Sequence, residues 1–291
     1  DQYISFADGS RPAGQYDPAI MTTDQTSCDE GYVGSADVYA QLGLSVNQFN
    51  DYTGGSSENS NCSYTSNFNG TSSAAPNVSG AIALMLEANP ALTWRDVKHI
   101  LASTSRQIDA DRYYAHATGI TQYEWETNAA GYTHHNWYGF GSLDTAAAVS
   151  AAKAYTAGSL GDFNDTGYIG SGSLGDSGLT GSYSVLDSTL SINKGDLSGN
   201  FVEFIRVYFN LNHSSVRDIG MELISPQGTR VNILQPFTNV GTNPANYVVE
   251  IGVSAFYGEE VEGDWTLRVT EYTNDGTQGL LDYWGMKIYG H

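Results

Sequence analysis

The sequence predicts two parts that fold differently: a strand-and-helix part over residues 1–157 and an all-β sandwich over residues 158–291. Three observations support this division into two parts. The length of 291 residues suits about two domains of ~100–200 residues each. Residues 74–88 are apolar almost all round, which indicates a buried helix. After a Gly/Ser/Asp-rich stretch over 157–181, β-patterned runs recur with no helix between them, as in a sandwich.

The first 70 residues read as strands and loops. Tyr3–Ala7 and Ala19–Thr23 are short β-prone runs. From Gln25 to Asn69 the chain is mostly Gly, Ser, Asn and Asp, which form turns. Because a loop of this length is uncommon in a compact domain, we expect it to be functional or an insertion.

Three helices are expected after this loop. Pro76 suits the first turn of the apolar helix, where its missing N–H costs nothing. Thr93 begins the second helix as an N-cap, with Asp96 three residues later in a capping-box position. The third follows Gly141 and runs to about Ala154.

The β-patterned runs of the second part share short length, β-branched and aromatic residues, and flanking turns. They are Val202–Phe209, Met221–Ile224, Arg230–Leu234, Tyr247–Ile251, Trp265–Val269 and Trp284–Tyr289. Trp265 and Trp284 could form a platform for a sugar, but their strand spacing favours core positions.

Charge excludes several partners. The formal net charge is −20, from 32 acidic and 12 basic residues. A nucleic-acid ligand needs Lys and Arg to displace counterions, so nucleic-acid binding is not expected. Anionic headgroups would also repel this chain, and no apolar run reaches the ~18 residues of a spanning helix, so we expect no membrane contact. An acidic, Tyr-rich and Gly-rich chain is typical of an extracellular protein.

Two cysteines, Cys28 and Cys62, lie 34 positions apart in polar sequence. Two distant thiols are too few for a metal site of soft ligands. One structural disulfide in an oxidising compartment fits the even count, and two free thiols are the alternative.

The heptad Gly70-Thr-Ser-Ser-Ala-Ala-Pro76 lies where the loop enters the apolar helix. Backbone N–H groups at a helix N-terminus stabilise negative charge that develops on a nucleophilic serine such as Ser72. Gly70 permits close approach of a substrate to the backbone. The alternative is an ordinary turn before a core helix. Five specified residues at ~7% each give on the order of one chance match in two thousand chains of this size.

Gly-Thr-Ser-x-Ala-x-Pro resembles the nucleophile signature of the subtilisin-like serine proteases. Residues 86–99, 125–131 and 135–144 are similar to the kexin/furin-like branch and its bacterial relatives. Residues 218–229, 263–267 and 279–290 resemble its P domain, also called Homo B. The resemblance implies an α/β subtilisin-like catalytic domain (C-terminal portion only) over 1–157, followed by an all-β, jelly-roll-like P-domain sandwich over 158–291. Residues ~25–65 match least and look like a disulfide-stapled insertion.

The resemblance makes Ser72 the acylating nucleophile, supported in substrate and oxyanion binding by Gly70 and Thr71. Family members use Ser-His-Asp acyl transfer, in the chain order Asp, His, oxyanion Asn, Ser. Only 71 residues precede Ser72 and none is a histidine. We therefore expect these three groups on a missing N-terminal segment, and this chain alone to be inactive. The expected partner is then an N-terminal fragment of the same protease, and the expected substrates are polypeptides.

Calcium is a further expectation. Family members commonly bind it, mainly in the part that this chain lacks. Asp162, Asp165 and Asp176 cluster in the Gly-rich start of the second part, where carboxylates and carbonyls suit Ca²⁺. A solvated acidic linker is the alternative, because the spacing is not that of an EF-hand loop.

Two functions are weighed. The first is a secreted, extracellular serine endopeptidase represented by its Ser-bearing part. The second is a non-catalytic P-domain fragment that serves as a structural or partner-binding module. A purely structural piece need not keep the sequence around Ser72. A calcium- or sugar-binding sandwich would explain residues 158–291 but not Gly70–Pro76.

Overall fold

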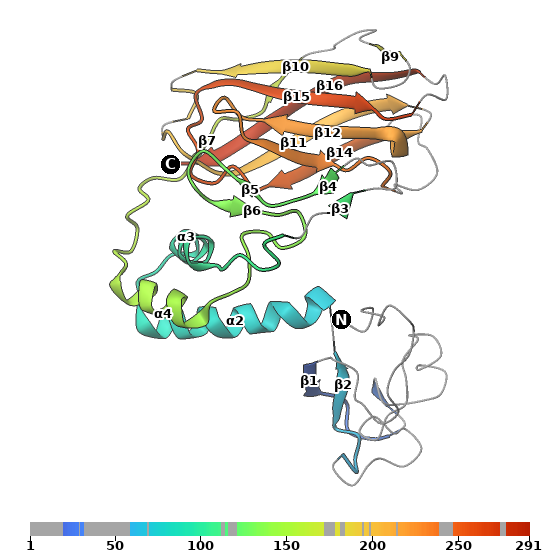
Figure 1. Cartoon of the computed structure of the whole chain (residues 1–291). Coiled ribbons are helices and arrows are strands. Elements are labelled where there is room, and N and C mark those ends of the chain that lie inside the picture. Colours follow the sequence, from blue (N-terminus) through green and yellow to red (C-terminus); the bar gives the residue numbers. More distant parts are fainter. Residues whose placement is uncertain are drawn as a thin grey trace. The chain divides into compact units, whose positions relative to one another are not determined.

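A computed structural model of the chain forms two compact units, Asp1–Leu84 and Met85–His291 (Figure 1). It describes residues 20–28, 30–31, 59–68, 70–111, 114–115, 121–171, 178–180, 184–193, 195–197, 199–213, 215–238, 247–273 and 278–291. The strand expected at Tyr3–Ala7 lies outside these residues. The units divide within a helix, and the expected domain boundary at 157/158 stays a prediction.

The first unit contains a disulfide beside a two-stranded ribbon. Strands β1 (Ile20–Thr23) and β2 (Tyr64–Phe68) pair antiparallel. Cys28 and Cys62 are bonded, with Cα atoms 5.0 Å apart, which is ordinary disulfide geometry. The predicted disulfide and the β-prone run before residue 24 are therefore confirmed.

Helix α2 (Gly70–Ala88) begins four residues earlier than the apolar pattern indicated. Ala81 and Met85 are buried one turn apart, whereas Leu84 is 49% and Leu86 is 39% exposed. The prediction of a helix buried on every side is thus wrong for the described structure. An apolar surface is buried only where other elements pack on it, and the described residues cover one face of α2.

Helices α3 (Trp94–Thr104) and α4 (Thr145–Ala154) follow in the second unit. The capping box is confirmed: the Thr93 side chain accepts from the N–H of Asp96, whose carboxylate accepts from the N–H of Thr93. In α3, Val97 and Ile100 are buried, whereas Trp94 is 62% exposed. Two short hairpins lie between the helices, β3 (Tyr114–Ala115) with β4 (Thr121–Tyr123) and β5 (Glu126–Thr127) with β6 (Thr133–His134).

Two antiparallel sheets form the expected sandwich (Figure 1). One has the order β10-β15-β12-β13. These strands are β10 (Val185–Ile192), β15 (Gly263–Glu271), β12 (Ile219–Ile224) and β13 (Arg230–Leu234). A 3₁₀ turn, η2 (Val216–Asp218), leads into β12.

The other sheet has the order β14-β11-β16-β7, and β8 and β9 also pair with β16. Its long central strands are β11 (Val202–His213) and β16 (Gln278–Gly290), and β14 (Tyr247–Val253) lies at an edge. The short strands are β7 (Asn164–Asp165), β8 (Ile169–Gly170) and β9 (Gly178–Thr180).

The sandwich core is built from alternate residues of both sheets. In β15 every second residue from Trp265 to Val269 is buried, and in β16 Trp284, Met286 and Ile288 are. Trp265 and Trp284 are fully buried, and their indole N–H groups donate to Val261 O and Ser188 Oγ. The core interpretation of both tryptophans is therefore confirmed, and neither ring is available as a sugar platform.

A buried histidine and a buried carboxylate lie against each other in the core. His213 Nε2 on β11 lies 2.7 Å from Glu271 Oε2 on β15, with both side chains at most 1% exposed. His213 Nδ1 accepts the N–H of Ser215, so Nε2 carries the proton that faces the carboxylate. Gly279 lies against this ring: a Cβ there would lie 2.0 Å from His213 Cδ2.

We expect Gly279→Ala to destabilise the sandwich by about 1–3 kcal/mol, because the added methyl overpacks a buried ring that is held by Glu271. Urea unfolding followed by tryptophan fluorescence measures the change. Gly80→Ala is the control. Gly80 lies inside α2 with no atom within 4 Å of a built Cβ, so that variant should be neutral or up to about 1 kcal/mol more stable. Equal midpoints for the two variants would contradict the overpacking.

Candidate active site

Ser72 lies in the first turn of α2, the position that the motif predicted for a nucleophile at a helix N-terminus. Its side chain is exposed, as are those of Thr71 and Ala74. Gly70 begins the helix with φ of +70°, which residues with a side chain rarely adopt. The hydroxyl is therefore presented to solvent beside unsatisfied helix N–H groups, where an oxyanion is stabilised.

Neighbouring side chains hold this turn. Ser73 is buried, and its Oγ donates to Gly70 O at 2.9 Å. Asn77 Nδ2 donates to Ser73 O at 2.7 Å. Of the two adjacent serines, the structure therefore assigns the packing role to Ser73 and leaves Ser72 accessible.

Pro76 lies inside α2 and not in its first turn, so that prediction is wrong. The helix begins at Gly70 because Gly70, Ser73 and Asn77 close an extra turn before the apolar run. Proline has no N–H, so Pro76 cannot donate the usual i→i−4 bond to the carbonyl of Ser72. The carbonyl oxygen of the expected nucleophile therefore lacks its usual helical donor four residues later.

The histidines that the structure describes lie in the second unit, each in contact with other side chains. His99 Nδ1 lies 3.0 Å from the Tyr257 hydroxyl, and burial lowers the pKa of His99. His135 stacks on Tyr138, and His291 Nδ1 lies 2.8 Å from Glu203 Oε1. His116 lies outside the described residues. The first unit, which contains Ser72, has no histidine in its sequence.

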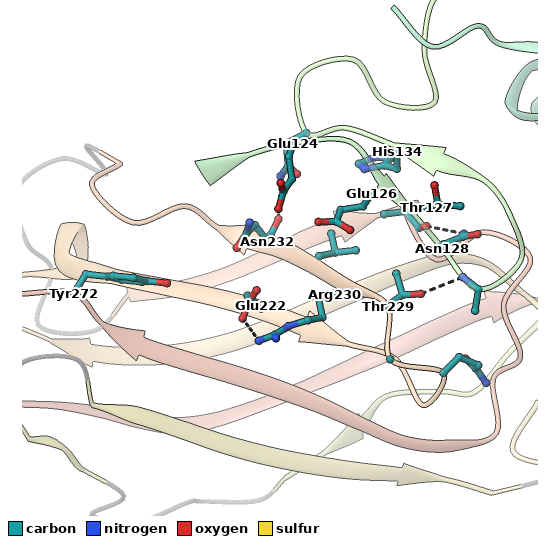
Figure 2. Close-up of a pocket in the computed structure, with 16 residues that line it drawn as sticks. Glu124, Glu126, Thr127, Asn128, His134, Glu222, Thr229, Arg230, Asn232 and Tyr272 are labelled. Carbon is teal, nitrogen blue, oxygen red and sulfur yellow. Dashed lines mark hydrogen bonds and ion pairs between the residues drawn. The ribbon is translucent and has the colours of Figure 1, made fainter. Parts of the chain in front are cut away.

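The second unit contains a polar cavity of about 620 Å³ that the sequence did not indicate (Figure 2). Glu124, Glu126 and His134 line it from the β5–β6 segment. Glu222 and Arg230 line it from β12 and β13 and form an ion pair at 2.9 Å. The one pattern in the sequence that could have pointed to this cavity is the pair of glutamates at positions 124 and 126. The facing strands, β12 and β13, lie about 100 positions later, so their contribution could not be seen in the sequence.

Titration behaviour in this cavity follows from burial. Burial lowers the pKa of His134 to about 4, with His135 adding to the effect. Burial, together with the charge of Glu124, raises the pKa of Glu126. Both pKa shifts go in the direction that disfavours the charged form of the side chain. Among the described residues, no three His, Cys, Asp or Glu side chains are arranged to hold a metal ion.

The described structure includes two of the three calcium candidates, Asp162 and Asp165. Asp165 Oδ1 accepts from the N–H of Gly167 and lies 3.1 Å from Lys287 Nζ. Asp162 is exposed, and Asp176 lies outside the described residues. A carboxylate that already pairs with an ammonium is a poor calcium ligand, so Asp165 is poorly placed for this role. Calcium binding by this set of residues stays a prediction.

Comparison with known proteins finds two family matches, in separate parts of the chain. Residues 32–141 match the subtilase family, and residues 202–288 match the proprotein convertase P-domain. The chain combines a subtilase segment with a P domain. Each matched range lies within one of the two expected parts, on either side of residue 157.

Two curated relatives illustrate the similarity. The extracellular serine protease of Aeromonas sobria is 29% identical over 97% of this chain and 51% of that protein. Human proprotein convertase subtilisin/kexin type 5 is 31% identical over 78% of this chain and 12% of that protein. The chain thus spans about half the length of the bacterial relatives that it matches.

Solved structures show the same fold. The Aeromonas sobria serine protease superposes with a TM-score of 0.78 at 29% identity, over 94% of this chain and 52% of that one. A second structure shows that protease in complex with the chaperone ORF2, with a TM-score of 0.77. Among the described residues of the present chain, no helix is long and apolar enough to cross a membrane.

We expect acid to destabilise the second unit in a step that depends on His134. The folded pKa of about 4 lies below the ordinary 6.5. Protonation therefore favours unfolding, and the contribution is complete above pH 6.5 and is lost as pH falls towards 4. Urea midpoints between pH 7.5 and 4 measure this. His134→Gln should flatten the profile, and an unchanged slope would contradict the assignment.

Proposed function

We propose that the whole protein is a secreted serine endopeptidase that hydrolyses peptide bonds by Ser-His-Asp acyl transfer, with Ser72 as the nucleophile. The supporting observation is the exposed Ser72 hydroxyl in the first turn of α2, within the subtilase segment. The extracellular Aeromonas relative supports secretion.

The mechanism needs a base and an oxyanion donor that the described residues do not bring to Ser72. We propose that the Asp, His and oxyanion Asn lie on polypeptide N-terminal to this chain, because no histidine precedes Ser72. A histidine there would take the Ser72 proton as the hydroxyl attacks the substrate carbonyl. The N-terminus of α2 would then stabilise the tetrahedral oxyanion with its N–H groups.

An active-site phosphonate tests this proposal, since it reacts only with an activated serine. We expect the purified native protein to be labelled at Ser72 and the 291-residue chain made alone to be unlabelled. Ser72→Ala in the whole protein should lower kcat by a factor on the order of 10⁶, as loss of the nucleophile does in subtilisin, a member of the family. Ser79→Ala, a second exposed serine on the same helix, is the matched control.

Two results would contradict the proposal. One is a native protein that mass spectrometry shows to be a single 31.3 kDa species without peptidase activity. The second is full peptidase activity in Ser72→Ala. Either would favour the alternative function, a P-domain fragment that serves as a structural or partner-binding module.

We also propose that the whole protein needs Ca²⁺, with ligands outside the described acidic residues of this chain. EDTA should then lower the Tm of the native protein and leave the Tm of the isolated chain unchanged. An equal fall in both would place a calcium site within this chain.

A further inference from the structure

An aromatic cleft of about 350 Å³ lies where α3 meets the P domain. Four rings line it: Trp94 from α3, Phe163 from the segment before β7, Phe204 from β11 and Tyr289 from β16. Lys98 and Arg206 complete the lining with Glu203. All of these residues belong to the second unit, so the cleft is complete within it.

The rings of the aromatic cleft are exposed yet held in place. Trp94 is 62% and Phe163 is 41% exposed, and the two rings meet edge to face with centroids 5.4 Å apart. Phe163 stacks on Tyr289 at 5.9 Å, and the Arg95 guanidinium lies over Phe163 at 5.1 Å. Ordered aromatic rings that remain open to solvent are typical of binding surfaces for large apolar groups.

Lys98 differs from the other cations around this cleft. Arg95, Arg206 and Lys287 each pair with a carboxylate, namely Glu203, Glu250 and Asp165. The Lys98 ammonium donates to the carbonyl oxygen of Glu203 at 2.9 Å and lies 5.2 Å from the centre of the Phe204 ring. Lys98 forms no ion pair with a carboxylate of the described residues. Burial lowers the pKa of Lys98.

This arrangement fits a ligand that has an apolar side chain beside a single carboxylate. The rings would bury the apolar group, and the carboxylate would accept from Lys98 at a site partly shielded from water, where such a bond is strong. A strongly acidic tract is less suited, because the net charge of −20 repels it at long range.

We propose that the aromatic cleft binds a segment of a partner polypeptide in which a large apolar residue is followed by Asp or Glu. The apolar side chain lies among Trp94, Phe163 and Tyr289, and the carboxylate pairs with Lys98. The proposal uses none of the residues assigned to catalysis, and it can be tested in the isolated chain.

The test is an NMR titration of the ¹⁵N-labelled chain with two peptides, acetyl-Gly-Phe-Glu-Gly-amide and acetyl-Gly-Phe-Gln-Gly-amide. The peptides match in shape and differ in one charge. We expect the Glu peptide to shift the Trp94 indole N–H signal with a Kd in the millimolar range or below. The Gln peptide should bind at least tenfold more weakly.

Variants of the chain separate charge from packing. Lys98→Met keeps most of the side-chain stem and should remove the preference for the Glu peptide, while Lys98→Arg should retain it. Lys153→Met, at an exposed position on α4, is the matched control and should change nothing. Trp94→Ala removes an exposed ring and should weaken the binding of both peptides. A thermal melt of each variant checks that it is folded.

Four results of the peptide titrations would overturn the proposal. They are equal binding of the two peptides, a Glu preference that survives Lys98→Met, shifts confined to residues away from Trp94, and free 3-phenylpropionate binding as tightly as the Glu peptide. The last would make the cleft a site for small carboxylates. A dimer seen by sedimentation that Lys98→Met abolishes would instead identify a second copy of this chain as the occupant, and would overturn it too.

Discussion

A single buried carboxylate, that of Glu203, is the group on which the second unit depends. It lies on β11, the strand that pairs with both β14 and β16, and it is 1% exposed. Burial alone would raise the pKa of Glu203, but hydrogen bonds from His291 and Arg95 outweigh this and lower it to about 2. A buried charge of this kind costs several kcal/mol unless cations surround it, so its partners must stay in place.

Those partners come from different parts of the chain. Arg95 is on α3, donates to both carboxylate oxygens of Glu203 and also donates to the carbonyl of Gly161. The requirement to neutralise Glu203 thus holds α3 and the segment before β7 against the sandwich. The aromatic cleft forms beside this junction, because Trp94 and Phe163 flank Arg95 and are placed by the same contacts.

A second set of contacts strengthens the junction. Asn128 Nδ2 donates to the carbonyls of Ala255 and Tyr257, and the Glu259 carboxylate accepts the N–H of Ala129. The end of the subtilase segment and the P domain therefore belong to one compact unit, Met85–His291. Composition changes near residue 157, but buried polar contacts decide which parts of the chain remain together.

Local features were predictable where their cause is local. The capping box at Thr93 and Asp96, the Cys28–Cys62 disulfide and the alternation around Trp265 each depend on a few neighbouring positions or on chemistry with few alternatives. The predictions for α2 were wrong because contacts with other residues decide its burial and its first residue. The burial of α2 depends on which elements cover it, and its first residue depends on side-chain bonds such as that from Ser73 to Gly70.

The sequence by itself determined the two kinds of folding, the approximate positions of three helices and six sandwich strands, and the serine at the start of α2, since these follow from periodicity and a short motif. Only the tertiary structure decided that Ser72 is exposed while Ser73 is buried, and that Glu203 joins α3 to the sandwich. The polar cavity of Glu124 and Glu222 and the aromatic cleft around Lys98 also needed the structure. The cavity brings Glu124 to Glu222 and the cleft brings Trp94 to Tyr289. A pattern along the chain does not record which distant side chains meet once the backbone is folded.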